Sequence, residues 1–311
     1  MNDQPDPLPL TIISGYLGAG KTSLVNHLLR HANGRRLMVM VNDFGELPID
    51  AALIETRDGD TINLANGCVC CSMGGDLFDA LVKVLDTTPR PDHLLIEASG
   101  VADPAKIANI ARAEPDLRLD AIVSLVDAGN FEQLLNNPLI GQTLAHQVKI
   151  SDIIVLNKLD LADTEARNTL RETIAEIAPD APWLETRNAK VPIDLVIGPQ
   201  AVTSSTFTEM PDHGDHGAAY AKWSMFFEHP VERDQLEKTL SRLDTSVLRL
   251  KGIVHLKGSQ NACSVQCVGQ RCTITPMEKN MSQKPSGLIA IGLANRLDKP
   301  ALDRLFASLQ Q

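Results

Sequence analysis

The chain has 311 residues, with 29 basic and 39 acidic side chains and a formal net charge of −10. Its length predicts two domains, or one large and one small domain. The acidic balance, without any basic block, argues against a nucleic-acid partner or an anionic membrane surface. No stretch approaches the ~20 apolar residues of a membrane span, and the N-terminus lacks the basic start and apolar core of a signal peptide. We therefore expect a cytoplasmic protein with no membrane partner.

The first motif is GYLGAGKT at residues 15–22, which fits the phosphate-binding pattern G-x-x-x-x-G-K-[ST]. An apolar stretch precedes it and a segment with helical spacing follows, so strand, turn and helix are predicted in the required order. Backbone N–H groups and the helix dipole would face the phosphates, with Lys21 on the β- and γ-phosphates and the Thr22 hydroxyl on Mg²⁺. The predicted nucleotide-binding residues are Gly15, Gly18, Ala19, Gly20, Lys21, Thr22 and Ser23. A chance match in a glycine turn is the alternative.

Apolar runs that suit buried strands alternate with helical segments through the first two-thirds of the chain. The candidate strands are residues 10–14, 37–41, 93–97, 121–126, 152–156 and 183–186. The candidate helices lie near residues 22–31, 75–85, 104–111, 131–136, 139–149 and 164–177. Continuous apolar strands separated by helices predict an α/β fold with a doubly wound, mostly parallel sheet covered on both faces.

The loop after the second candidate strand reads Val41-Asn42-Asp43-Phe44-Gly45-Glu46. A loop at that place can reach the γ-phosphate side of the nucleotide, so Asp43 is a candidate for the magnesium shell and for catalysis. An ordinary polar turn is the alternative for this short string.

Three thiols fall within four positions in the string Gly67-Cys68-Val69-Cys70-Cys71-Ser72. Zinc and Cu(I) favour thiolate ligands, so this string predicts a soft metal site that needs at least one further ligand from elsewhere. Buried apolar cysteines and a redox thiol pair are the alternatives. In a cytoplasmic protein we do not expect the six cysteines to form disulfides.

The third candidate strand ends in Glu97, followed by Ala98-Ser99-Gly100. An acidic residue there, with Gly100 after it, occupies the place of the second NTPase motif, although many GTPases carry Asp-x-x-Gly. The Glu97 carboxylate would bind Mg²⁺ directly or through water, or position the attacking water. A carboxylate that only caps the following helix is the alternative.

Residues 157–160 read Asn157-Lys158-Leu159-Asp160, directly after an apolar strand, and fit the guanine-specific N-K-x-D pattern of P-loop GTPases. The Asp160 carboxylate would accept from N1–H and the 2-amino group of guanine. Asn157 would meet the other edge of the ring, and the Lys158 stem would lie along the base. A helix cap formed by Asp160 alone is the alternative.

Residues 199–222 are polar, small and unperiodic, and predict a flexible linker between a nucleotide-binding domain of residues 1–198 and a C-terminal α+β domain of residues 223–311. The linker contains Asp212-His213-Gly214-Asp215-His216, where His213 and His216 would bind a metal weakly; a solvated segment with incidental histidines is the alternative. In the last domain the candidate strands are residues 223–228, 247–256, 263–268, 271–275 and 288–293, and the candidate helices are 231–240 and 299–309.

Cys263, Cys267 and Cys272 lie in the candidate strands of this last domain. A second metal site is one interpretation. Cys263 and Cys267 share one side of a strand by period-2 spacing, where cysteine is usually a small apolar filler, and we favour that interpretation.

Taken together and in this order, GYLGAGKT, NDFGE, GCVCC, LLIEASGVADP and NKLD resemble the CobW-type GTPases, metal-handling P-loop proteins grouped with the hydrogenase and urease nickel-insertion GTPases. The resemblance covers the nucleotide-binding domain almost completely, and the C-terminal part is similar to the family's small domain. It implies GTP hydrolysis, a metal site at Cys68, Cys70 and Cys71 with Glu46 nearby, and delivery of a metal to a client protein.

The resemblance implies zinc as the cargo, with cobalt, for cobalamin synthesis or nitrile hydratase, as the alternative. A GTP-dependent zinc-sensing regulator that transfers nothing is a second alternative, and cysteine redox chemistry is a third. Nucleotide and metal would be linked reciprocally, because a ligand that tightens the binding of another is itself tightened by the same factor. A nucleotide- or metal-dependent homodimer is possible within this scheme.

Overall fold

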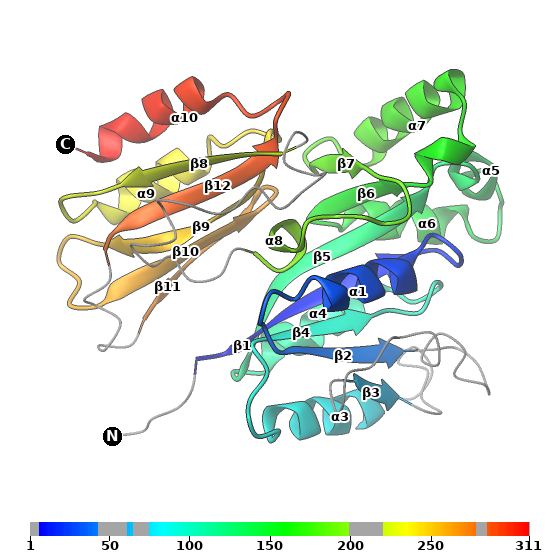
Figure 1. Ribbon diagram of the computed structural model, residues 1–311, viewed down its shortest axis with the longest axis horizontal. Helices are drawn as coiled ribbons and strands as arrows, with labels where there is room; N and C mark the ends of the chain where they lie inside the picture. The colour runs from blue at the N-terminus through cyan, green and yellow to red at the C-terminus, as the bar shows by residue number, and fades with distance from the viewer. Residues whose placement is uncertain (1–5, 43–60, 65–74, 199–219, 278–284, 311) are drawn as a thin grey trace. The chain divides into compact units, whose positions relative to one another are not determined.

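The computed structural model describes residues 6–42, 61–64, 75–198, 220–277 and 285–310 (Figure 1). The chain divides into two compact units: Met1–Pro179 with Trp183–Ile197, and Asp180–Pro182 with Gly198–Gln311. In the described part of the chain, no helix is long and apolar enough to cross a membrane.

The first unit is built on a seven-stranded sheet whose order is β3-β2-β4-β1-β5-β6-β7, and every pairing in it is parallel. Its strands are β1 (Leu8–Gly15), β2 (Leu37–Asn42), β3 (Thr61–Leu64), β4 (His93–Glu97), β5 (Leu117–Asp127), β6 (Ile153–Asn157) and β7 (Trp183–Glu185). The predicted α/β fold with a parallel sheet is confirmed. The central strand β1 pairs with β4 on one side and β5 on the other, so the chain leaves β1 where the strand order reverses, the usual place for a ligand in such sheets.

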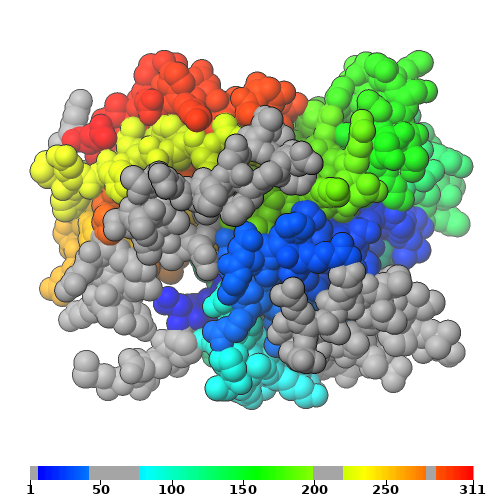
Figure 2. Space-filling model, in the orientation of Figure 1, coloured from blue at the N-terminus to red at the C-terminus, as the bar shows by residue number. Residues whose placement is uncertain are grey.

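Helices connect these strands on both sides of the sheet. They are α1 (Lys21–Arg30), α3 (Gly75–Leu85), α4 (Pro104–Ala113), α5 (Phe131–Leu135), α6 (Gly141–Lys149), α7 (Thr164–Ile177) and α8 (Ile193–Val196), with a 3₁₀ turn η1 (Leu159–Leu161). Helix α1 packs on β1 and β4, and its outward side forms part of the blue surface in Figure 2.

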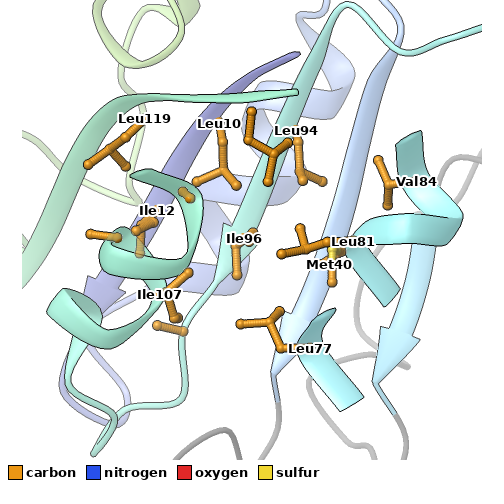
Figure 3. Close-up of a cluster of buried hydrophobic side chains, with 14 of the residues drawn as sticks. Leu10, Ile12, Met40, Leu77, Leu81, Val84, Leu94, Ile96, Ile107 and Leu119 are labelled. Atoms are coloured by element: carbon orange, nitrogen blue, oxygen red, sulfur yellow. The ribbon is translucent and has the colours of Figure 1, made fainter. Parts of the chain in front are cut away.

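The opposite face of the sheet carries a buried aliphatic core against α3 and α4. Figure 3 shows Leu10, Ile12 and Ile96 from the strands meeting Leu81 of α3 and Ile107 of α4. Since strand side chains alternate between faces, the odd-numbered residues of β1 and β4 point to the α1 side. Glu97, the last residue of β4, is one of these, and so its carboxylate lies beside α1.

The second unit contains an antiparallel sheet in the order β11-β10-β9-β12-β8. Its elements are β8 (Tyr220–Phe226), α9 (Arg233–Leu240), β9 (Val247–His255), β10 (Ala262–Val268), β11 (Arg271–Pro276), β12 (Gly287–Leu293), α10 (Lys299–Phe306) and η3 (Ala307–Leu309). Trp223, Leu250, Val265 and Phe306 belong to one core cluster between the sheet and its helices. This is the α+β arrangement that the sequence predicts.

Two elements of the first unit differ from the sequence prediction. Strand β3 and helix α8 were not expected, and both are very short, four residues each. Such elements lack the length over which periodicity can be seen. Of the predicted linker, residues 199–219 lie outside the described residues, and Tyr220 already begins β8.

Candidate functional site

The phosphate-binding string forms a turn between β1 and α1, at the carboxyl edge of the sheet. Gly15 has a φ of 132°, and a Cβ on it would lie 2.3 Å from the carbonyl oxygen of Leu125. Gly20 has a φ of 105°, and a Cβ there would lie 2.5 Å from Nδ2 of Asn157. Both positions therefore require glycine, for backbone conformation and for space. The turn leads into the N-terminus of α1 with no side-chain cap, which leaves its N–H groups available to an anion.

Lys21 and Thr22 open helix α1, and the Thr22 side chain contacts Glu97. The Thr22 hydroxyl donates to Oε1 of Glu97 over 2.8 Å, and the Lys21 ammonium donates to the carbonyl of Tyr16 over 3.3 Å. Glu97 and Lys21 are both buried, with 2% and 6% of their surfaces exposed. The structure thus brings together three residues that the sequence assigns to the triphosphate and its magnesium.

The segment after Glu97 is held by helix α6. The side-chain amide of Gln147, itself 2% exposed, donates to the carbonyls of Gly100 over 3.2 Å and of Ala102 over 2.9 Å. One position earlier on the helix, the His146 ring contacts Oδ1 of Asp103 at 3.2 Å. Gly100, the predicted glycine of the second NTPase motif, is therefore tied to a helix that lies far from it in the sequence.

The guanine-type string begins at the end of β6, and its asparagine joins two loops. Nδ2 of Asn157 donates to the carbonyl of Ala19 over 2.9 Å, and Oδ1 accepts from the backbone N–H of Ala189 over 2.9 Å. Both ends of this amide are therefore engaged by protein, and Asn157 ties the phosphate loop to the loop of residues 186–190. Asn188 and Ala189 have φ values of 55° and 52°, which shapes the loop that presents this N–H.

Lys158 and Asp160 occupy different environments in the same loop. Nζ of Lys158 forms an ion pair with Oδ2 of Asp127 at 2.9 Å, and Asp127 also accepts from the N–H of Gly129 over 3.0 Å. Asp160 is exposed at the surface. Because Asp127 ends β5 and Lys158 follows β6, the paired strands bring these residues together.

Sequence analysis missed Asp127, Gln147 and Ala189 as parts of this site. Asp127 ends an apolar strand, in the same position as Glu97 on β4, so this signal was present in the sequence. Gln147 and Ala189 carry no such signal, because an amide on a helix and an alanine in a loop gain their role only through contacts distant in sequence.

Seven residues assigned to metal binding lie outside the described residues: Asp43, Glu46, Cys68, Cys70, Cys71, His213 and His216. The described strands nearest in sequence to Asp43 and to the cysteines are β2 and β3. Leu64 of β3 pairs with Asn42 of β2, and Val41 of β2 pairs with Glu97 of β4. The Asp43 segment thus follows the strand that neighbours Glu97, and the cysteine segment follows the next strand of the sheet.

The cysteines of the second unit do not form a metal site. Cys267 and Cys272 are register partners on β10 and β11 and are joined by a disulfide, so the expectation that the cysteines stay unbridged is wrong for this pair. Hairpin register placed them opposite each other, and period-2 spacing within one strand could not show it. Cys263 is a free thiol buried in the core; burial raises its pKa, and the charge of Arg233 lowers it by less. Among the residues with described positions, no group of three or more His, Cys, Asp or Glu could hold a metal.

Comparison with known proteins places this site in a family. The CobW/HypB/UreG nucleotide-binding domain matches residues 9–185, and the cobalamin synthesis protein cobW C-terminal domain matches residues 220–310. The chain belongs to the CobW/HypB/UreG family. With the phosphate loop, Glu97 and the N-K-x-D string at one edge of the sheet, it is a P-loop GTPase of the CobW type.

Individual relatives agree with this assignment. A zinc chaperone CobW from Pseudomonas aeruginosa is 30% identical over 336 residues, covering 95% of this chain and 89% of the relative. The zinc chaperone YjiA from Escherichia coli is 29% identical, covering 98% of this chain and all of that protein. The crystal structure of Zn(II)-bound YjiA GTPase from E. coli matches 99% of this CobW-type chain at 24% identity with a TM-score of 0.47.

Proposed function

We propose that this protein is a GTP-hydrolysing metal chaperone. It binds zinc at Cys68, Cys70 and Cys71, with Glu46 nearby, and delivers it to a client protein in a manner set by the bound nucleotide. Support comes from the family and from relatives named as zinc chaperones. The cysteine trio supplies the soft ligands that zinc favours.

The observation that carries the proposal is the meeting of four strand ends. β1 leads into the phosphate loop, β2 into the Asp43 segment, β3 into the cysteine segment and β4 into Glu97. A change at the γ-phosphate would therefore act on segments that each follow one of four neighbouring strands of the sheet. Order or release of such segments on hydrolysis is the established means by which GTPases switch.

The donor set at α1 fits magnesium. The Thr22 hydroxyl and the buried Glu97 carboxylate already lie 2.8 Å apart, and both are the oxygen ligands that Mg²⁺ takes. Thr22 and Glu97, with Asp43, would hold the ion. When bound, the ion neutralises charge on the β- and γ-phosphates.

The protein's own residues perform the rest of the nucleotide chemistry. Lys21 exchanges its contact with the Tyr16 carbonyl for the β- and γ-phosphate oxygens, where its charge offsets the charge that develops as the bond breaks. The N–H groups at the start of α1 orient the phosphates. Asp160 accepts from the guanine edge, which adenine cannot match because it lacks donors at those positions.

Metal titration under defined nucleotide states tests the site. Zinc affinity is measured by competition with a chromophoric chelator for the wild type and for Cys70→Ser/Cys71→Ser, with GTP analogue and with GDP. We expect one zinc per wild-type chain with an affinity that differs between the two nucleotides, and loss of that zinc in the double variant. Cys263→Ala, which removes a buried thiol of the second unit, is the matched control. Unchanged zinc binding in the double variant would contradict the site.

Transfer of labelled zinc tests the chaperone role. A candidate client should receive zinc faster in the presence of GTP than with a non-hydrolysable analogue. Equal rates with intact zinc binding would favour a zinc-sensing regulator, and preferential binding of Co²⁺ in competition would reassign the cargo. Thiols that remain open to alkylation after zinc loading would instead favour redox chemistry.

A further inference from the structure

An arginine of the next helix holds the loop that carries Asp160. Nε of Arg167, on α7, donates to the carbonyl of Leu159 over 3.1 Å and to that of Ala162 over 3.0 Å. These two carbonyls enclose Asp160 and Leu161 on both sides, within and just after η1. Arg167 is half-buried, so this contact is partly shielded from water.

The other end of the loop is fixed as well. Asn157 bonds the phosphate loop and Ala189, and Lys158 is paired with Asp127. The backbone of Lys158 has a φ of 59°, a left-handed conformation that turns the chain sharply. Asp160 thus lies on a short turn whose backbone is held before it and after it.

The Asp160 side chain is exposed and makes no hydrogen bond or ion pair with any residue whose position is described. Its direction is therefore set by the backbone that carries it and not by its own partners. Simultaneous acceptance from two parallel N–H donors demands a defined carboxylate direction. If the loop could move about Asp160, the carboxylate would keep one of its two hydrogen bonds to the base more readily than both together.

We propose that Arg167 is a positioning residue for guanine specificity. By holding the carbonyls of Leu159 and Ala162, it keeps the Asp160 carboxylate aligned with both N1–H and the 2-amino group of the base. This inference rests on the proposed role of Asp160. A site built to bond a ligand N–H discriminates strongly against analogues that lack it, and that discrimination depends on the alignment that Arg167 maintains.

The chain offers a matched control one turn along the same helix. Arg171 pairs with Glu185, with Nε and Oε1 2.7 Å apart, and also bonds Oδ1 of Asn168. No bond joins its side chain to the loop of residues 157–162 among the described contacts. Arg167→Ala and Arg171→Ala remove the same atoms from the same helix, so that they share the cost in helix propensity and packing.

The experiment compares affinities for GDP and for IDP, the inosine analogue that lacks the 2-amino group. We expect Arg167→Ala to weaken GDP binding about tenfold, the loss of about one hydrogen bond, and IDP binding by clearly less. The GDP-to-IDP ratio then falls several-fold, KM for GTP rises, and kcat is unchanged. Arg171→Ala keeps the wild-type ratio. In an Asp160→Ala background, Arg167→Ala produces no further change in the ratio.

Two outcomes distinguish failure of the proposed guanine contact of Asp160 from failure of the inference about Arg167. If Asp160→Ala keeps the wild-type GDP-to-IDP ratio, Asp160 does not contact the 2-amino group, and both the proposed guanine contact and this inference are overturned. If Asp160→Ala abolishes the ratio while Arg167→Ala preserves it and only lowers thermal stability, Arg167 is structural and the guanine contact stands. Should Arg167→Ala fail to fold, the ratio measured on Arg167→Lys, which retains the charge but not the planar donor geometry, decides in the same way.

Discussion

Asn157 provides the sharpest test of how the nucleotide site is held together. Asn157→Ala removes an amide that is 2% exposed and makes two hydrogen bonds of 2.9 Å. The change leaves the carbonyl of Ala19 and the N–H of Ala189 without this partner in a buried place. Each such group costs about 1–3 kcal/mol, so we expect a total loss of about 2–6 kcal/mol.

That loss should lower both the thermal stability of the first unit and the affinity for GDP. In a unit of this size, at about 2–4 °C for each kcal/mol, it lowers the melting temperature of the first unit by about 4–24 °C. Because the two loops that Asn157 joins both border the nucleotide site, the affinity for GDP should fall at least about tenfold. Calorimetry with and without GDP measures the first quantity, and titration of a fluorescent GDP analogue measures the second.

Asn168→Ala is the control for this substitution. Asn168 is exposed on α7, and within the described part of the chain its side chain bonds only Arg171, so its removal should change stability by less than about 0.5 kcal/mol. If Asn157→Ala has the same melting temperature as Asn168→Ala and binds GDP like the wild type, the two hydrogen bonds contribute nothing measurable to stability or affinity. A lowered melting temperature with wild-type GDP affinity would show that the tie serves the fold and not the pocket.

Three further predictions concern other parts of the chain. Thr22→Val keeps the shape of the side chain but removes the hydroxyl that donates to Glu97, so Mg²⁺-dependent GTP hydrolysis should fall about 10- to 100-fold. Thr22→Ser, which keeps a hydroxyl, should retain this activity. Wild-type Mg²⁺ dependence in Thr22→Val would show that Thr22 is not a ligand of the ion. Gln147→Leu deletes both hydrogen bonds to the carbonyls of Gly100 and Ala102, so hydrogen exchange should be faster in peptides covering residues 99–103. His146→Ala, a change at a half-exposed contact, should barely alter the exchange of these peptides. Equal exchange in the two variants would show that Gln147 does not hold this segment. Burial raises the pKa of Tyr220 to about 12, so the phenolate absorbance of Tyr220, measured in Tyr16→Phe, should appear near pH 12. Since the unfolded state releases this proton from about pH 10, the free energy of unfolding should fall between these two pH values. Ionisation of Tyr220 near pH 10 without unfolding would contradict its burial.

The sequence by itself determined the class of fold and predicted most residues of the candidate nucleotide site. The phosphate loop, Glu97 and the N-K-x-D string are local patterns, each composed of a strand followed directly by its functional residues. Such patterns can be recognised because the chemistry and the secondary structure share the same few residues. The α/β alternation was equally visible, since long apolar strands and amphipathic helices differ in period.

Only the tertiary structure decided which residues support the site. Asn157 reaches Ala19 across 138 positions and Gln147 reaches Gly100 across 47, and no local period encodes a contact of that kind. The Cys267–Cys272 disulfide likewise depends on the register of two strands. A hydrogen bond between residues distant in sequence exists only once the sheet has brought its strands into order, and for that reason the supporting residues appeared in the fold and not in the motifs.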